Sequence, residues 1–187
     1  MFNTNLSSIP FNSSYLKTSK EKDTEWLDKL KLNKQKLNIA ITFAGNPDYV
    51  ADSERSASLE IFYPLVDKAN LFLIQKDIRK EDEIFLKKYP QIKFIGKDID
   101  NFDDLASVIQ NMDFVISTDT SIPHLAAALG KKVFILLGRI TDWRWMLNSG
   151  TSPWYNSATL LRKKFNPESK TEDWSYAFQQ IIKDFKI

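Results

Sequence analysis

Short runs of consecutive apolar residues, separated by segments with helical spacing, constrain the fold of this chain more than any other feature. Strands are expected at 37–43, 71–74, 92–95, 114–117, 133–137 and 158–161. Helices are expected between them at 56–66, 84–88, 103–112 and from residue 122 onward, with a last one at 174–185. Apolar strands without polar alternation are typical of a parallel sheet whose two faces are covered by helices. The alternation predicts right-handed βαβ units, and therefore an α/β fold with a Rossmann-like, doubly wound parallel sheet.

The length of 187 residues, 43% of them hydrophobic, suits one full domain. Residues 1–36 are interpreted as an N-terminal arm followed by a short, lysine-rich helix around Trp26 and Leu30. Residues 37–187 are expected to form the Rossmann-like domain.

Composition and charge argue against several classes of protein. The 26 basic and 24 acidic side chains leave a net charge of +2, which gives no support for a nucleic-acid surface. One histidine and no cysteine argue against a zinc centre, and neither a metal nor a cofactor is expected. No apolar run reaches the ~18 residues that cross a membrane. The N-terminus also lacks the pattern of a secretory signal, so a cytoplasmic location is expected.

The segment Asp119-Thr120-Ser121 lies between an expected strand and an expected helix, and it has the chemistry of an anion site. Thr120 or Ser121 can cap the helix, whose free N–H groups and dipole attract an anion. His124 lies one turn into this helix and can face the same anion. Such a site suits a phosphate, and a diphosphate better. Two alternatives are left open: the polar residues are an ordinary helix cap, and the lone histidine is structural, as lone histidines often are.

The helix after this turn is built from small residues. Ala126, Ala127 and Ala128 allow a close approach to the sheet, and Gly130 is expected to end the helix. Two further turns leave strand ends with polar residues, namely 44–56 after the first strand and Gln75-Lys76 after the second. Neither carries a dinucleotide fingerprint or a P-loop, and the chain has no G-x-S-x-G elbow of an α/β-hydrolase.

The stretch "DFVISTDTSIPHLAAALGKKVFILL", followed by "DWRWMLNSGTSPWY", resembles the C-terminal half of bacterial GT-B-fold glycosyltransferases. Within them it is most similar to the group often fused to tetratricopeptide repeats, which is related to O-linked N-acetylglucosamine transferases and to ADP-heptose:lipopolysaccharide heptosyltransferases. The resemblance implies one half of a GT-B fold and a nucleotide diphosphate sugar as donor. It also implies a partner, either a separate N-terminal half or a tetratricopeptide-repeat region.

The resemblance also implies roles for individual residues. Ten candidates for substrate binding follow from it: Asp119, Thr120, Ser121 and His124 at the diphosphate and sugar, Gln75 and Lys76 at the phosphate or base, Gly45 and Asn46 facing the cleft, and Arg55 and Arg144 as further basic groups. His124 is the candidate catalytic residue, and no general base is identified. Asp48, Asp52 and Glu54 are interpreted as solvated loop carboxylates, and Trp143 and Trp145 as packing residues rather than ligand contacts.

Two functions are therefore carried forward. The first is the donor-binding half of a glycosyltransferase, which transfers a sugar to an unknown acceptor hydroxyl. The alternative is a non-catalytic nucleotide-binding or protein-interaction module derived from such a transferase.

Overall fold

The computed structural model describes residues 5–10, 13–50 and 52–187. Residues 1–4 and 11–12 of the expected arm, and Ala51 of the first loop, lie outside the described residues. The main sheet has six strands: β1 (Asn38–Ile41), β2 (Asn70–Leu73), β3 (Lys93–Phe94), β4 (Phe114–Thr118), β5 (Val133–Leu137) and β6 (Ala158–Arg162).

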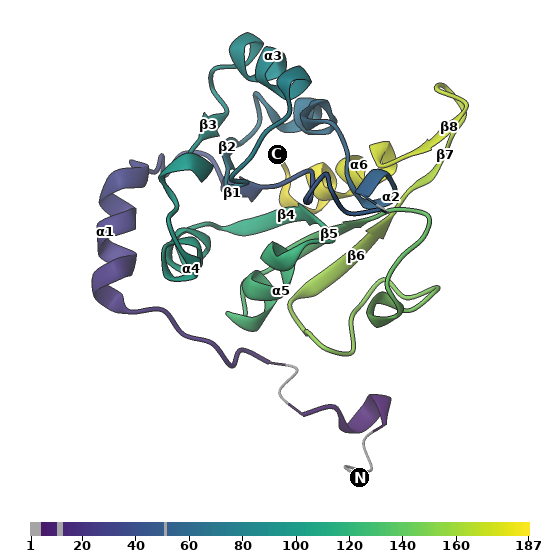
Figure 1. Cartoon of the computed structure of the whole chain (residues 1–187), viewed down its shortest axis with the longest axis horizontal. Helices are drawn as coiled ribbons and strands as arrows, with labels where there is room; N and C mark the ends of the chain where they lie inside the picture. Colours follow the sequence, from purple (N-terminus) through teal and green to yellow (C-terminus); the bar gives the residue numbers. More distant parts are fainter. Residues whose placement is uncertain (1–4, 11–12, 51) are drawn as a thin grey trace.

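These strands run in the order β3-β2-β1-β4-β5-β6, and every neighbouring pair is parallel (Figure 1). This is the strand order of a doubly wound sheet built from two halves that meet between β1 and β4. The predicted Rossmann-like α/β fold is confirmed.

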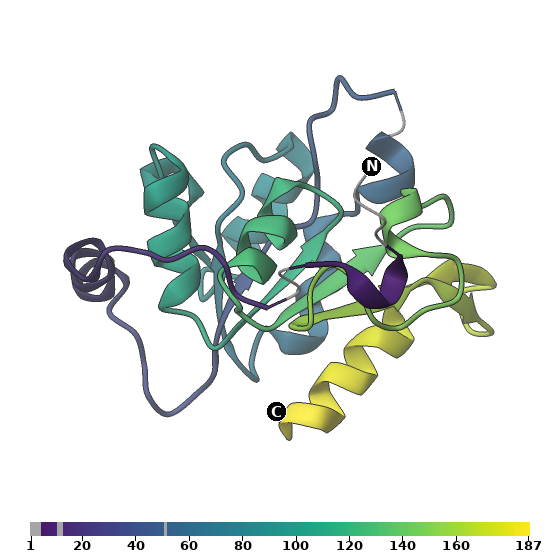
Figure 2. The same cartoon turned by 90° about the horizontal axis from the view of Figure 1, so that it is seen from below.

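Helices cover both faces of this sheet, as Figure 2 shows. One face carries α1 (Lys20–Leu30), α4 (Phe102–Gln110) and α5 (Ser121–Ala128), and the other carries the 3-10 helix η2 (Leu59–Leu65), α3 (Lys80–Lys88) and α6 (Ser175–Phe185). Successive strand residues point to opposite faces, so Ile39 and Ile41 pack in the core on the α6 side while Ala40 packs in the core on the α5 side. Both faces are buried, which explains the unbroken apolar runs.

The helix expected at 56–66 is wrong in both its start and its type. The element is a 3-10 helix that begins at Leu59, and the hydroxyl of Ser58 accepts from the N–H of Glu60 at 3.2 Å. Pro64 lies inside it, and proline has no N–H to donate to an α-helical ladder. Ser56, the first residue of the expected helix and a possible cap by its residue type, accepts instead from the N–H of Gly45 at 3.0 Å.

Several short elements were not expected from the sequence. They are η1 (Leu6–Ser8), α2 (Asp52–Arg55), η3 (Gly96–Asp98), η4 (Trp143–Trp145), and the antiparallel hairpin of β7 (Lys164–Asn166) and β8 (Thr171–Asp173). The hairpin strands are three residues long and largely polar, so they carry no hydrophobic period.

The N-terminal segment is attached to the domain at two places. The N–H groups of Tyr15 and Leu16 both donate to the carbonyl of Ala128 at 3.0 Å, so the arm runs past the end of α5 (Figures 1 and 2). Further on, Trp26 is buried against α4 and its indole N–H donates to Asp104 at 3.0 Å. The domain boundary at residue 36 stays a prediction. No helix in the described ranges is long and apolar enough to span a bilayer.

Candidate functional site

A cavity of about 670 Å³ lies at the carboxyl ends of β1, β4 and β5. This is the place where the strand order reverses, and open α/β sheets bind their ligands there. Its lining comes from the loop after β1, the start of α5 and the loop after β5: Tyr49, Glu54, Arg55, Asp119, Thr120, Ser121, His124, Ile140, Thr141, Asp142 and Arg144. Six of the ten predicted site residues thus border one cavity, which is called the anion cavity below.

The start of α5 supplies the floor of the anion cavity. Thr120 occupies the N-cap position in extended conformation, but its hydroxyl makes no capping bond to the helix. Its Oγ1 is buried and has no hydrogen-bond partner within the described residues. The expected side-chain cap is therefore absent, and Ser121, the first helical residue, is exposed. The first N–H groups of the helix are left to a ligand or to water.

The other end of α5 agrees with the sequence. The last turn of α5 is buried through Ala126, Ala127 and Ala128. Shortly after the helix ends, Gly130 has a φ of 74°. Glycine adopts this left-handed conformation without steric cost. Small residues therefore bring the helix, and with it the start of the anion cavity, close to the sheet.

Two arginines border the anion cavity from opposite loops. Arg55 donates to the Oδ1 of Asp52 at 3.3 Å and to the carbonyl of Asp119 at 3.4 Å, and it lies over the ring of Tyr49 at 4.5 Å. Arg144 pairs with Asp142 at 2.6 Å on the other side. Guanidinium groups present planar, permanently charged donors that suit phosphate oxygens.

Close backbone approaches hold these loops in place. A side chain at Gly138, directly after β5, would overlap the carbonyl of Glu54 in the loop after β1. Similarly, a side chain at Gly96 would overlap the carbonyl of Gln75. The absence of a Cβ at Gly138 lets the two arginine-bearing loops touch, and this contact sets the width of the anion cavity.

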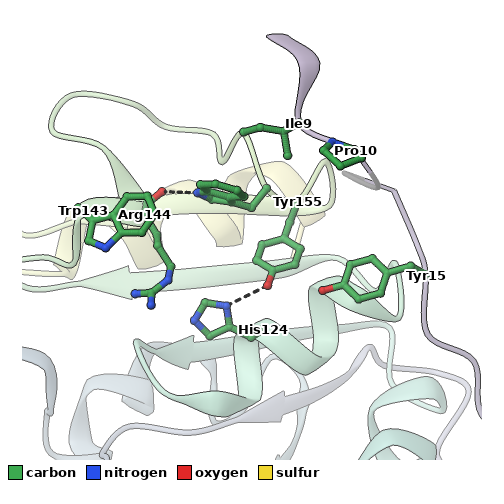
Figure 3. Close-up of a pocket in the computed structure, with 8 residues that line it drawn as sticks. Ile9, Pro10, Tyr15, His124, Trp143, Arg144 and Tyr155 are labelled. Carbon is green, nitrogen blue, oxygen red and sulfur yellow. Dashed lines mark hydrogen bonds between the residues drawn. The ribbon is translucent and has the colours of Figure 1, made fainter. Parts of the chain in front are cut away.

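His124 lies between the anion cavity and a second cavity, shown in Figure 3. Its Nδ1 is 3.1 Å from the hydroxyl of Tyr155, and its ring stacks on Trp145 with centroids 5.0 Å apart. Burial lowers the pKa of His124, while the charge of Asp119 acts in the opposite direction. The imidazole is therefore neutral at neutral pH.

The second cavity has a volume of about 610 Å³ and mainly aromatic walls. Its lining is Ile9, Pro10, Tyr15, His124, Trp143, Arg144, Trp154 and Tyr155. Trp143 is 67% exposed there and meets the ring of Trp154 edge to face, whereas Trp145 is fully buried. The packing interpretation holds for Trp145 and fails for Trp143.

Asp119 is the partly buried carboxylate of the anion cavity. Burial raises its pKa, and the neighbouring Trp145 indole, His124 and Arg55 all act against that rise. Its backbone carbonyl already binds Arg55, so the carboxylate is the part that remains for a ligand.

The other four predicted site residues lie outside the lining of the anion cavity. Gln75 is buried, and its amide bonds only to backbone: its Oε1 accepts from the N–H groups of Phe43 and Ala44, and its Nε2 donates to the carbonyl of Asp77. Lys76 is exposed. The N–H of Gly45 binds Ser56, and Asn46 accepts from the N–H of Asp48 at 3.0 Å in a local turn.

The three loop carboxylates lie in different surroundings. Asp52 was interpreted as solvated, but it is only 6% exposed and pairs with Arg55 and Arg79. Glu54 borders the anion cavity, and Asp48 is exposed. Sequence reasoning missed Tyr15, Tyr49 and Tyr155, because nothing in their local pattern separates them from ordinary aromatic residues.

Part of the sequence and the fold of the chain are similar to those of known glycosyltransferases. The sequence model of Glycosyltransferase family 9 (heptosyltransferase) matches residues 95–178, which include α5 and the loop after β5. No curated protein matches the chain in sequence. The expected similarity to tetratricopeptide-repeat-associated or O-GlcNAc-transferase-like proteins is not shown by these comparisons and stays a prediction.

Solved structures with a similar fold include two heptosyltransferases and a family 9 glycosyltransferase. The E. coli ADP-heptose lipopolysaccharide heptosyltransferase II has a TM-score of 0.62 at 13% identity, over 91% of this chain and 52% of its own. A family 9 glycosyltransferase from Veillonella parvula has a TM-score of 0.62 at 12% identity, with 94% and 46% covered. The E. coli heptosyltransferase WaaC with ADP has a TM-score of 0.54 at 18% identity, with 95% and 53% covered. The chain thus spans about half the length of these proteins.

The lining of the anion cavity combines hydrogen-bond donors with carboxylates. The donors are the first N–H groups of α5, the guanidinium groups of Arg55 and Arg144, and the unpaired Thr120 hydroxyl, and the carboxylates are Glu54, Asp119 and Asp142. Within the described ranges, no three His, Asp or Glu residues are grouped so as to hold a metal ion.

Proposed function

We propose that this chain is the donor-binding half of a glycosyltransferase, which uses a nucleotide diphosphate sugar and transfers the sugar to an acceptor hydroxyl. The observation that carries the proposal is the anion cavity at the start of α5, in a segment matched by the glycosyltransferase family 9 model. The diphosphate would lie on the N–H groups of Ser121 and its neighbours, with the Thr120 hydroxyl as a further donor. Arg55 and Arg144 would neutralise its charge from the two sides.

In such a reaction the acceptor oxygen attacks the anomeric carbon, and the nucleoside diphosphate leaves with the electrons of the broken C–O bond. Negative charge grows on the leaving phosphate. Donors that are already oriented toward it stabilise that charge without reorganisation. His124 would contribute an N–H to the same phosphate, and Asp119 would accept from sugar hydroxyls. No described residue is assigned as the general base.

The remaining candidates have weaker support. Lys76, Gly45 and Asn46 lie near the ends of β1 and β2 but outside the anion cavity, so a contact would require a ligand that extends beyond it. The buried Gln75 stabilises the loop after β1 by accepting from the N–H groups of Phe43 and Ala44. A complementary α/β half, or a tetratricopeptide-repeat region, would supply the acceptor side, and the cytoplasm remains the expected location.

Binding to diphosphates tests the proposal directly. Pyrophosphate, ADP, UDP and GDP are titrated into the 187-residue protein, with and without Mg²⁺, and the melting temperature is followed. A ligand that binds only the folded state raises stability by RT ln(1 + [L]/Kd), about 2.7 kcal/mol at a hundredfold excess over Kd. A rise of several degrees is expected for at least one diphosphate, and a flat response to all of them would contradict the proposal.

A matched pair of variants locates the binding. Arg144 borders the anion cavity, whereas Arg139 is an exposed arginine of the same loop outside its lining. Arg144→Gln should weaken diphosphate binding about tenfold, since hydrogen bonds to charged groups contribute ~1.5–3 kcal/mol. Arg139→Gln makes the same change in net charge and should leave binding within twofold of the wild type. Equal losses in the two variants would point to nonspecific charge attraction.

The alternative is a nucleotide-binding module without transfer activity. Its supporting observation is that no described residue is assigned as the general base that transfer to a hydroxyl requires. Both functions predict diphosphate binding. They differ in sugar transfer, which should appear with a complementary half only if the first proposal holds.

A further inference from the structure

The only histidine of the chain is held by two aromatic residues, Tyr155 and Trp145. Its Nδ1 lies 3.1 Å from the Tyr155 hydroxyl, its ring stacks on Trp145, and the rings of His124 and Tyr155 lie at a steep angle to each other with centroids 5.7 Å apart. Figure 3 shows the second ring nitrogen pointing away from Tyr155. The orientation of the ring is therefore set by its surroundings, and one nitrogen remains for another partner.

The direction of the bond between Tyr155 and His124 follows from acid–base chemistry. In a neutral imidazole, one nitrogen donates and the other accepts. A phenol O–H is a far stronger acid than a neutral imidazole N–H, and an imidazole nitrogen is a better acceptor than a phenol oxygen. Burial and the neighbouring Tyr15 raise the pKa of Tyr155 to about 12, so its proton is retained at all physiological pH values. Tyr155 is therefore the donor and Nδ1 the acceptor.

The proton of the neutral ring must then reside on Nε2. The charged groups that act on His124 are Asp119, Asp142 and Arg144. The two carboxylates favour an N–H that points toward them, and Arg144 opposes it. Asp119 comes from the same turn and borders the anion cavity with His124.

We propose that Tyr155 is a positioning residue, which fixes His124 in the Nε2–H tautomer so that the ring enters the anion cavity as a neutral hydrogen-bond donor. The identity of the anion rests on the proposed function, whereas the tautomer does not. A neutral donor keeps its N–H across the physiological pH range, unlike an imidazolium that loses its charge near neutrality. Tyr155 lines the second cavity, and His124 lines both cavities. The hydrogen bond between these two residues therefore links the second cavity to the anion cavity.

A single histidine makes this measurable without ambiguity. In the ¹⁵N-labelled chain, two-bond ¹⁵N–¹H correlation spectra show whether each ring nitrogen carries a proton. Near-complete Nε2–H tautomer is expected at pH values around 7.5. A dominant Nδ1–H tautomer in the wild-type protein would overturn the proposal, and this result needs no variant.

Tyr155→Phe keeps the ring and removes only the hydroxyl. It should give a mixture of both tautomers and weaken pyrophosphate binding about three- to tenfold, a loss expected for one hydrogen bond to a charged group that is imperfectly replaced. Tyr63→Phe removes the hydroxyl of an exposed tyrosine on η2 and should change neither quantity. An unchanged tautomer in Tyr155→Phe would overturn the positioning role.

The two proposals can fail separately. An Nε2–H tautomer that depends on Tyr155 supports the positioning role even where pyrophosphate, ADP and UDP do not bind, and that lack of binding would count against the proposed function alone. If pyrophosphate binds while His124 is the Nδ1–H tautomer, the proposed function is supported and the positioning role of Tyr155 is contradicted.

Discussion

The loop after β1 and the turn after β4 leave the sheet from neighbouring strands. They differ in whether their buried polar groups are hydrogen-bonded within the protein. In the loop after β1, Gln75 satisfies the N–H groups of Phe43 and Ala44, and Ser56 links Gly45 to Asp52. In the turn after β4, the hydroxyls of Thr118 and Thr120 are buried without a partner among the residues described.

Both segments carry polar residues at a strand end, and both were assigned to ligand binding from the sequence. The difference lies in whether the protein itself already occupies their hydrogen-bonding groups. Satisfied groups shape the site, since removing one of them leaves its partner buried and unpaired. Unsatisfied groups add little to stability and are left for a ligand. Mutations in the loop after β1 should therefore mainly lower the stability of the fold. Mutations in the turn after β4 should mainly weaken ligand binding.

The largest effect is expected for Gln75→Leu. This change leaves the N–H groups of Phe43 and Ala44 buried without an acceptor, which should cost about 2–5 kcal/mol of unfolding free energy. Urea denaturation measures the loss, and Gln91→Leu at an exposed glutamine should stay within about 0.5 kcal/mol of the wild type. The folded fraction should still bind pyrophosphate. Full stability with lost binding would show Gln75 to be a ligand contact and would break the comparison.

A smaller effect of opposite sign is expected for Thr120→Val. Valine has the same shape and removes an unpaired buried hydroxyl, so stability should stay equal or rise by up to about 1 kcal/mol. Pyrophosphate binding should weaken several-fold in calorimetry. Thr141→Val is the matched control, because that hydroxyl accepts from Arg162 at 3.3 Å and its loss should lower stability instead. A clear destabilisation by Thr120→Val would mean that its hydroxyl caps the helix after all.

The smallest effect is a pH dependence from His124. Its pKa in the folded protein lies below the ordinary value of 6.5, so its contribution to stability is complete above that value. As the pH falls through 6.5, the unfolded chain takes up a proton that the folded protein refuses, and stability declines by at most ~1.4 kcal/mol per pH unit.

Comparison with His124→Gln isolates this contribution from the carboxylates. Urea denaturation of both proteins at about pH 7.5 and about pH 5.5 should show a decline that is larger in the wild type. Parallel pH profiles would mean that the imidazole titrates normally in the folded state.

The sheet could be predicted because its signal is local. The runs around Ile39, Phe72, Val115 and Ile135 are each buried on both faces, so most of their residues are apolar. The elements that were missed depend on distant contacts or on single residues. The expected α-helix over residues 56–66 is a 3-10 helix with Pro64 inside it, and the hairpin near Phe165 has strands too short to carry a period.

In the candidate site, too, the contiguous segment could be predicted from the sequence and the long-range contacts could not. The segment from Asp119 to His124 is contiguous, so helix-start chemistry identified it directly. The bonds of Gln75 to Phe43 and Ala44, and the ion pair of Asp52 with Arg79, could not be read from sequence, because these partners lie about 30 residues away along the chain. The bond between His124 and Tyr155 spans a similar separation, and it required the fold to bring the two together.

Gly138 and Gly96 have a consequence for how such a sequence can diverge. At both positions any side chain would collide with the backbone of a neighbouring loop, and a backbone atom cannot rotate away as a side chain can. Substitution there should be forbidden for reasons of space alone, whatever molecule occupies the anion cavity. The residues that line the cavity carry no such restriction, so a lineage can exchange one ligand for another while the spacing of the loops is inherited unchanged.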